Sequence, residues 1–370
     1  MDWMVFFISF AVFYSAGARG VGMQECGLLG ILFQAAYMMS SYVSGHVVSH
    51  RNARTVLFSS TAVCGISSIC CLLFTAIGPL SASLVVFGVS AAFFFNSFQA
   101  FMRGEASVGS LKNSVALYTL SWCAGAAMGN VTAGWLYNWG LAPMISVVAA
   151  AALFIVFMLS RQGKQGDDRS SADEETEHGT CPAHPVENSY IYVGWIMIFT
   201  VTFVQRPLFT FLPPMFASEG IGSLKASLPL FVHMGAVALF GFWMLRFRNL
   251  LYRKTPFCII QLCGAASLCV IWTWPSYWVC FFMLFLLGIY GAFVFYCAVY
   301  YASNSGRRSF NIGINEALVG LGSIAGLFFG DWWMRSSGSN ASMYLVCAAG
   351  LAVSVTAQIA AAVFKQKKST

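Results

Sequence analysis

Long apolar stretches alternate with short polar segments along the whole chain of 370 residues. Most of these stretches approach the roughly 20 residues that an α-helix needs to cross the hydrocarbon core of a bilayer. None shows the alternating pattern of a membrane β-strand. The pattern predicts an all-α polytopic membrane protein with spans at 3–18, 25–47, 54–76, 82–102, 115–136, 141–160, 189–212, 226–245, 256–275, 277–301, 310–331 and 341–364.

One polar interval is much longer than the others. Residues 161–188 read RQGKQGDDRSSADEETEHGTCPAHPVEN, which is rich in charged and small polar residues. A segment of this composition cannot bury enough apolar surface to fold, so it predicts a flexible linker. We therefore expect a first six-helix bundle over 1–160, a linker over 161–188, and a second bundle with a short basic tail over 189–370.

The positive charges predict the orientation of the spans. With the N-terminus inside the cell, Arg19, Lys225 and Arg335 are the only basic residues in loops on the outer side. Cytoplasmic loops attract an excess of Lys and Arg, so both termini are predicted to be cytoplasmic. The basic residues on that side are Arg51, Arg54, Arg103, Lys112, Arg161, Lys164, Arg169, Arg246, Arg248, Arg253, Lys254, Arg307, Arg308, Lys365, Lys367 and Lys368.

Composition agrees with a membrane protein and excludes several other classes. Hydrophobic residues make up 58% of the chain and charged residues only 9%, far below the roughly 25% of a soluble domain. The net charge of +7 reflects topology rather than nucleic-acid binding. The 12 cysteines lie scattered in apolar runs, where they act as small buried hydrophobes. The start of the chain lacks a basic n-region and a cleavage site, which argues against a removable signal peptide. We expect a multi-pass protein of the plasma (inner) membrane.

The two halves of the chain resemble each other. Residues 91–101 align with 291–301, and residues 114–136 align with 311–333. The second alignment pairs Gly125 with Gly322, Gly129 with Gly326, and Trp135 with Trp332. Parallel repeats of six spans joined by one linker are a plan of rocking-bundle carriers.

With these repeats, the chain resembles the major facilitator superfamily. The resemblance implies two pseudo-symmetric six-helix bundles around a central cavity that opens alternately to either side. The family's loop between helices two and three reads G-x-x-x-D-R-x-G-R-K. Here Gly45 and Arg54 are retained, while Ser49 replaces the Asp and Asn52 replaces the second Gly. Gly45 and Arg54 are therefore candidate gating or packing residues.

Glycines in the fifth and eleventh spans are further packing candidates. The family's exporters carry G-P-x-x-G-G in helix five, and this chain keeps Gly129 and Gly134 but lacks the Pro. Small residues four apart let helix backbones approach closely, so we favour packing over a role in transport direction for Gly125, Gly129, Gly134, Gly322 and Gly326.

Ionisable residues within spans are costly in a bilayer and usually mark a functional cavity. Arg206 offers a planar fork for a carboxylate or phosphate, and Pro207 would kink the helix beside it. Gln205 is a second candidate contact. The alternative is that Arg206 reaches the outer interface, about six residues from the predicted end of its span.

Glu316 is predicted to lie about two turns inside the eleventh span, from the cytoplasmic end. A carboxylate there can accept a transported proton. The alternative is a structural ion pair with a cytoplasmic cation such as Arg307 or Arg308.

The resemblance implies that helices one, four, seven and ten line the cavity. Asn96 and Gln99 share one face of the fourth span, and Tyr296 and Tyr300 share one face of the tenth. Tyr14 lies in the first span, and all five are candidate substrate contacts or, for the tyrosines, interfacial anchors.

Histidines are weaker candidates. His46 and His233 are expected to be hydrogen-bonded packing residues rather than titrating groups. His178, Cys181 and His184 have metal-ligand spacing, but no fourth ligand is evident, so we expect no metal and no cofactor.

The sequence lacks a nucleotide-binding Gly-rich loop with Lys-Ser/Thr, an HExxH motif and a Gly-x-Ser-x-Gly elbow, so neither ATP-driven pumping nor catalysis is expected.

We expect a monomeric secondary transporter of a small organic solute, with a proton or solute gradient as its energy source and the lipid bilayer as its surroundings. The alternatives are a multidrug-type proton antiporter and a transport-dead sensor or scaffold.

Overall fold

The computed structural model describes residues 1–103, 111–161, 185–246, 253–304 and 308–366, with the backbone alone near some edges of these ranges. Within them the chain forms twelve α-helices, a short 3₁₀ turn at Met244–Arg246 and no strand. The helices are α1 (Asp2–Ala18), α2 (Met23–Val47), α3 (His50–Leu73), α4 (Ile77–Arg103), α5 (Leu111–Tyr137), α6 (Leu141–Arg161), α8 (Pro185–Ser218), α9 (Ser223–Trp243), α10 (Lys254–Thr273), α11 (Tyr277–Asn304), α12 (Arg308–Ser337) and α13 (Ser342–Gln366).

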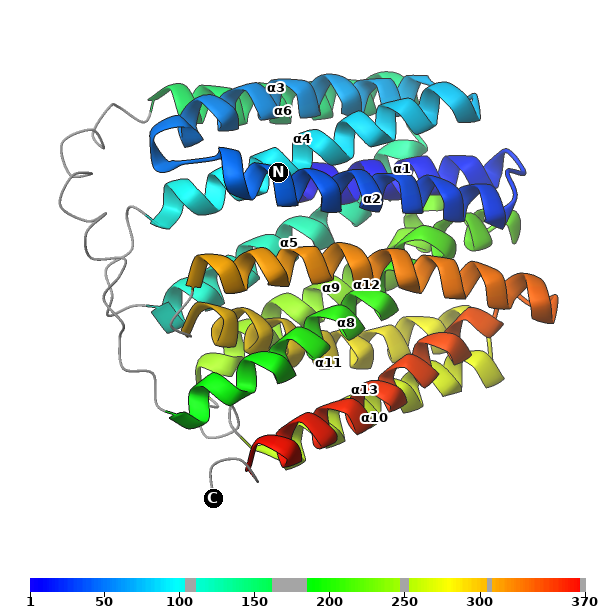
Figure 1. The fold of residues 1–370 in the computed structure, drawn as a ribbon. Helices are drawn as coiled ribbons and strands as arrows, with labels where there is room; N and C mark the ends of the chain where they lie inside the picture. Colours follow the sequence, from blue (N-terminus) through cyan, green and yellow to red (C-terminus); the bar gives the residue numbers. More distant parts are fainter. Residues whose placement is uncertain (104–110, 162–184, 247–252, 305–307, 367–370) are drawn as a thin grey trace.

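The helices lie side by side in two groups, α1 to α6 and α8 to α13 (Figure 1). In the first group α1 packs on α5, α2 on α4, and α3 on both α4 and α6. In the second group the equivalent helices pair in the same way, with α8 on α12, α9 on α11, and α10 on both α11 and α13. The predicted repeat is therefore present in the helix packing.

The outer surface is suited to lipid. Ten of the described helices are long and apolar enough to cross a membrane, and α1 is a shorter apolar helix. Large apolar side chains such as Leu153, Phe154 and Val353 are exposed on the outside. This surface confirms the predicted class of polytopic all-α membrane protein, because a water-soluble fold would cover such side chains with polar groups.

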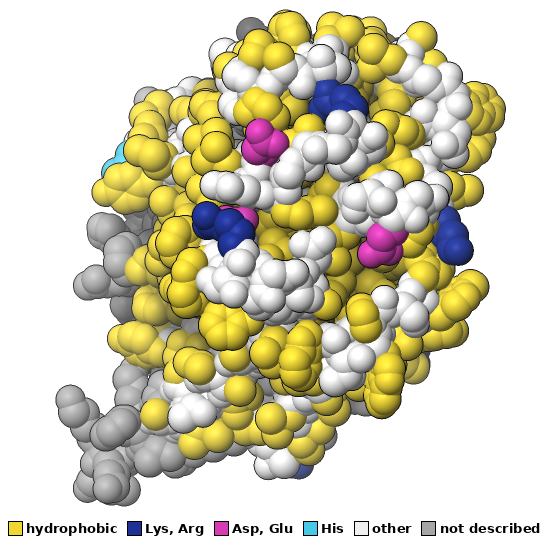
Figure 2. All heavy atoms as spheres, turned by 90° about the vertical axis from the view of Figure 1, so that its right-hand side faces the viewer, with side chains coloured by type: hydrophobic (Ala, Val, Ile, Leu, Met, Phe, Trp, Pro, Cys, Tyr) yellow, Lys and Arg dark blue, Asp and Glu magenta, His cyan; other side chains and the backbone are white. Residues whose placement is uncertain are grey.

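The two ends of the helices differ in charge. We call the end at which α6 stops and α8 starts the linker end, and the opposite end the far end. Arg19, Lys225 and Arg335 lie at the far end, whereas ten basic residues of the described backbone lie at the linker end: Arg51, Arg54, Arg103, Lys112, Arg161, Arg246, Arg253, Lys254, Arg308 and Lys365. Figure 2, which views the far end, shows only a few charged side chains on a surface of apolar and uncharged groups.

α8 and α12 extend six residues past the predicted far ends of their spans. α8 continues to Ser218 rather than 212, and α12 continues to Ser337 rather than 331. α8 passes through Pro207, Pro213 and Pro214 without ending. Proline keeps a helical φ and loses only its own donor, and neighbouring helices compensate for this loss in a membrane bundle. The extension of α8 places Arg206 deeper in the bundle than the sequence suggested.

Within each half, glycines bring two helices into close contact: α1 and α5 in the first half, and α8 and α12 in the second. A Cβ on Gly129 would collide with the carbonyl oxygen of Trp3 in α1, and a Cβ on Gly326 would collide with that of Phe203 in α8. One turn earlier, a Cβ on Gly322 would collide with the carbonyl oxygen of Phe199, and a Cβ on Gly125 would lie tightly against the amide nitrogen of Trp3. At these four glycines the helix backbones approach closely enough that a larger side chain would not fit without a shift.

A buried polar network joins three helices of the second half. The side-chain amides of Gln261 in α10 and Gln358 in α13 exchange hydrogen bonds of 2.7 and 3.1 Å. Ser354 connects them to Thr200 of α8, whose hydroxyl donates to Ser354 at 2.8 Å. Each group finds a partner inside the protein, as a low-dielectric surrounding requires.

Gly326→Ala is expected to destabilise the fold, because the added methyl group would overlap the Phe203 carbonyl. Overpacking of this kind costs about 1–3 kcal/mol, which thermal unfolding of the purified protein in detergent would detect. Gly45→Ala is the matched control, since a Cβ at Gly45 meets nothing within 4 Å. Equal stability of the two variants would contradict the packing role.

Candidate functional site

Arg206 lies in the interior between the two halves. It precedes the far end of α8, Ser218, by twelve residues, or about 18 Å at 1.5 Å per residue. The six-residue distance taken from the sequence was too short, because α8 extends past its prolines. The guanidinium carbon lies 5.9 Å from the centre of the Phe6 ring of α1, so Arg206 points into the bundle rather than to the far surface.

The Arg206 side chain is half-buried and has no hydrogen bond or ion pair within the part of the chain that the structure describes. Its other neighbour is Tyr37 of α2, which lies within electrostatic range. A guanidinium in a low-dielectric interior is costly without a partner. The geometry therefore leaves its five donors available to water or to a bound anion.

Tyr37 connects this cation to a carboxylate. Its hydroxyl donates to Oε2 of Glu316 in α12 at 3.3 Å, and Tyr118 of α5 is also within electrostatic range of Tyr37. Tyr37, Tyr118 and Glu316 are all half-buried. The hydrogen bond joins the first half of the molecule to the second.

A chain of aromatic contacts extends from Phe6, the ring next to Arg206. The Phe6 ring meets Phe209 of α8 edge to face at 5.1 Å and Trp122 of α5 at 6.3 Å. Trp122 in turn meets Phe295 of α11 at 4.9 Å. Trp122 is half-buried, whereas the phenylalanines are buried.

We define the interface site as Phe6, Tyr37, Trp122, Arg206 and Glu316. Its members come from α1, α2, α5, α8 and α12, and therefore from both halves. Arg206 is suited to an anionic group, the rings to an apolar or aromatic body, and Glu316 to a proton.

Gln205 does not join this site. Its Nε2 lies 2.9 Å from Nε2 of His233 in α9, and Nδ1 of His233 lies 3.0 Å from the carbonyl oxygen of Leu284 in α11. Both Gln205 and His233 are buried. They link α8, α9 and α11 within the second half, in agreement with the packing role expected for His233.

Asn96 also makes structural contacts. Its Nδ2 donates to the carbonyl oxygen of Ser41 at 2.9 Å and to the hydroxyl of Ser44, which ties α4 to α2. The side chain of Gln99 lies outside the described residues. Tyr296 and Tyr300 are both buried and stack in parallel within α11, with 6.2 Å between their ring centres.

Tyr14 belongs to the closed far end. Its hydroxyl donates to the carbonyl oxygen of Ile221 in the turn between α8 and α9, at 2.9 Å. Nearby, Ser223 donates to the carbonyl oxygen of Gly134 at 2.7 Å and to Asn138 at 3.0 Å. These three hydrogen bonds all cross between the halves.

At the linker end, the loop that resembles the family motif forms local caps. Arg54 donates to the carbonyl oxygen of Leu159 at 3.1 Å, near the C-terminus of α6, where a cation is favourable. The Ser49 amide donates to the Asn52 side chain at 2.8 Å, so the residues that depart from the motif stabilise the start of α3. His46 is exposed and contacts the carbonyl oxygen of Tyr42.

The possible metal set His178, Cys181 and His184 lies outside the described residues. Among the residues that the structure does describe, no group of three or more His, Cys, Asp or Glu side chains could hold a metal ion. The eleven described cysteines are free thiols.

Sequence reasoning missed Phe6, Tyr37 and Trp122. Tyr37 lies in a helix that the resemblance does not place around the cavity, and aromatic residues are so frequent in this chain that none stood out. It also missed Asp331, because the predicted span stopped there. In the structure, Asp331 lies inside α12 and forms an ion pair of 2.8 Å with Arg335.

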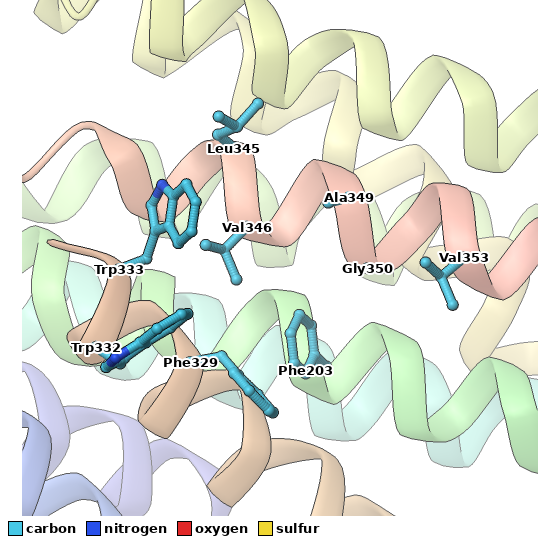
Figure 3. A pocket seen from close by; sticks show the side chains of 9 residues that line it. All are labelled: Phe203, Phe329, Trp332, Trp333, Leu345, Val346, Ala349, Gly350 and Val353. Carbon is cyan, nitrogen blue, oxygen red and sulfur yellow. The ribbon is translucent and has the colours of Figure 1, made fainter. Parts of the chain in front are cut away.

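A separate cavity of about 380 Å³ opens to the outside between α8, α12 and α13. Figure 3 shows Phe203, Phe329, Trp332 and Trp333 on one side and residues of α13 on the other. Its lining has no charged side chain, so it suits hydrocarbon rather than a polar solute. It is therefore a weaker candidate for a solute site than the interface site.

Comparison with known proteins agrees with this architecture. Residues 1–306 match a family model described as Major Facilitator Superfamily. Two solved structures of a bacterial homologue of the human lysosomal transporter Spinster are similar, both at 15% identity over 98% of this chain. The inward-facing unoccupied structure gives a TM-score of 0.57 over 93% of its length, and the occupied one gives 0.60 over 92%. At this identity the likeness shows the fold alone. No curated protein matches the chain.

Gln205→Leu is expected to lower stability by about 1–3 kcal/mol, because it leaves a buried nitrogen of His233 without a partner. Thermal unfolding in detergent measures the loss. His233→Leu combined with Gln205→Leu should recover part of it, since both polar groups are then removed. Unchanged stability of the single variant would show that Gln205 is free for a solute.

Proposed function

Because the chain belongs to the major facilitator superfamily, we propose that it is a secondary transporter for a small organic anion. The family works by alternating access, and its activity is transport rather than catalysis. The observation that carries the choice of an anion is Arg206, a cation between the two halves that has no partner among the described residues.

Arg206 fits the role of an anchor by its chemistry. A guanidinium binds a carboxylate with two parallel hydrogen bonds, which fixes the orientation of the anion as well as its position. Phe6 beside it, and Trp122 next to Phe6, would cover the apolar body of the solute. Gln205, Asn96, Tyr14, Tyr296 and Tyr300 would act indirectly, through helix packing and the closed far end.

Alternating access requires the halves to separate at the far end. We propose that residues 1–160 and 189–370 move as two bodies joined by the linker 161–188. The hydrogen bonds of Tyr14 and Ser223 across the halves would break on opening and form again on closing. Glycines such as Gly134, which abuts Ser227 of α9, would let the helices slide at close range.

Glu316 is the proposed coupling residue. It is half-buried within α12 and lies near Arg206 through Tyr37, so a proton there would change the charge of the site. The structural alternative is an ion pair between Glu316 and Arg307 or Arg308. Arg307 lies outside the described residues, and the side chain of Arg308 is not described.

We propose an orientation with the linker end and both termini in the cytoplasm of a cell whose plasma membrane holds the protein. Support comes from the distribution of Arg and Lys between the ends.

A monomer is sufficient, since the interface site is built from one chain. No contact favours the multidrug exporter or the sensor. Gly129, from the segment that resembles the exporter motif, packs on α1, and Ser49, which replaces the Asp of the family's loop motif, caps α3.

The orientation predicts which ends react with membrane-impermeant thiol reagents. Ser339→Cys, at an exposed position at the far end, should be labelled in intact cells. Ser49→Cys, at an exposed position at the linker end, should be labelled only after the membrane is opened. The parent protein is the control for its own cysteines. The reverse pattern would invert the topology.

Arg206→Lys is expected to reduce uptake of labelled monocarboxylates such as benzoate by roughly 10- to 100-fold. A lysine offers a point charge in place of two aligned hydrogen bonds, and bonds to charged groups are worth about 1.5–3 kcal/mol. Uptake into vesicles and protein abundance are both measured. Arg335→Lys, which keeps a cation beside Asp331 at the far end, is the matched control. Normal uptake by Arg206→Ala would rule out the anchor.

A further inference from the structure

A glutamine of α2 lies at the same depth as Arg206 and carries an oxygen without a partner. Gln34 is 3% exposed, and its Oε1 is buried with no hydrogen bond to any residue that the structure describes. We propose that Gln34 is a second polar contact of the solute, and that the solute is a hydroxy acid whose carboxylate binds Arg206 and whose hydroxyl group binds Gln34. The inference rests on the proposed function, because it requires that Arg206 holds the carboxylate.

A close contact one turn away sets the position of Gln34. A Cβ on Gly30 of α2 would lie 3.0 Å from Cγ2 of Thr210 in α8 and 3.1 Å from Cδ1 of Leu327 in α12. α2 and α8 run in opposite directions, and Gln34 follows Gly30 by four residues. Arg206 precedes Thr210 by four residues, so both side chains lie one turn toward the linker end from the same contact. Gln34 is therefore level with Arg206, on the side of α2 that faces α8.

Contacts on the other side of Gln34 also belong to the interface between the halves. Tyr37, one turn further along α2, donates to Glu316 of α12 and lies within electrostatic range of Arg206. Next to it, Met38 packs so closely on Gly320 of α12 that a Cβ on Gly320 would collide with it. The amide of Gln34 is thus enclosed between two contacts of α2 with the second half, and separation of the halves would open it to a solute.

The two unpaired groups complement each other. Arg206 offers donors without an acceptor and Gln34 offers an acceptor without a donor, within the described part of the chain. Leaving a buried acceptor unpaired costs more than an ordinary hydrogen bond gains. The side chains do not satisfy each other in this structure, but a solute with an acid group and a donor would satisfy both.

The chemistry of Gln34 selects a hydroxyl group as that donor. An amide has an oxygen that accepts and an NH₂ group that donates, and a hydroxyl can do both, so it fits either orientation of the amide. A second carboxylate cannot donate to Oε1. An ammonium group can, but it would place a second positive charge near the Arg206 guanidinium in a poorly screened interior. Hydroxy acids are therefore favoured over dicarboxylates and amino acids.

The first test compares the affinities of benzoate and the three hydroxybenzoate isomers for the purified full-length protein in detergent, by titration calorimetry. The isomer that binds most tightly to the parent should exceed benzoate by about 3- to 10-fold, as one further hydrogen bond provides. Gln34→Leu and Gln34→Met should lose this preference and keep the affinity for benzoate. A preference retained in both variants would contradict the role of Gln34.

Stability without ligand gives a second readout, which a packing glutamine would not share. Gln34→Leu removes an oxygen that has no partner, so its Tm should equal or exceed that of the parent. Gln205→Leu is the matched control, because it removes a glutamine that contacts His233, and its Tm should fall. If the Tm of Gln34→Leu falls as far as that of Gln205→Leu, Gln34 is a packing residue and the inference is wrong.

The outcomes separate this inference from the proposed function. Binding of benzoate by the parent with no tighter binding of any hydroxybenzoate would overturn the hydroxy acid and leave Arg206 as the anchor. Absence of binding of benzoate and of all its hydroxy derivatives would count against the anion site itself, and the role of Gln34 would fall with it.

Discussion

A charge or polar group inside a helix bundle that faces hydrocarbon must find its partner within the protein, because lipid offers none. The second half meets this requirement at the Gln261–Gln358 pair and at Gln205, His233 and Leu284, where each side chain is matched to another across helices. The guanidinium of Arg206 has no such partner among the described residues. It lies between the halves with only an aromatic ring and a tyrosine close by, within the described part of the chain. The energetic cost of an unpaired guanidinium in the interior is tolerated where a ligand or water completes its hydrogen bonds.

The packing around α8 holds that cation in place. Pro207 removes the helical donor for the carbonyl oxygen of Phe203, four residues earlier. Gly326 of α12 lies directly against this oxygen, so the proline and the glycine belong to one contact. α12 also carries Glu316, ten residues before Gly326 along the same helix. Close packing of α12 on α8 thereby fixes the separation between the cation and the carboxylate that Tyr37 bridges.

The sequence predicted the fold well and the site only in part. Apolar length, the excess of Arg and Lys at one end and the aligned glycines sufficed for twelve helices in two related halves. Arg206 and Glu316 stood out because ionisable residues are rare within spans. Tyr37 did not stand out, because the neighbours of a tyrosine, whether an arginine, a carboxylate or lipid, depend on which helices cross. The local sequence pattern does not specify which helices cross. The same limit explains Asn96 and Gln205, whose polar side chains turned toward neighbouring helices of their own half. The end of α8 was misplaced because Pro213 and Pro214 continue a helix in this setting.

The central claim is that Arg206 holds the anionic group of a solute between the two halves. An experimental structure with 4-bromobenzoate bound would test it most directly, because the anomalous signal of bromine locates the molecule without reference to the protein. The account predicts a single site, with the carboxylate against the Arg206 guanidinium and the bromine beside Phe6 and Trp122. A bromine signal confined to the apolar cavity between α8, α12 and α13, with nothing at Arg206, would contradict it.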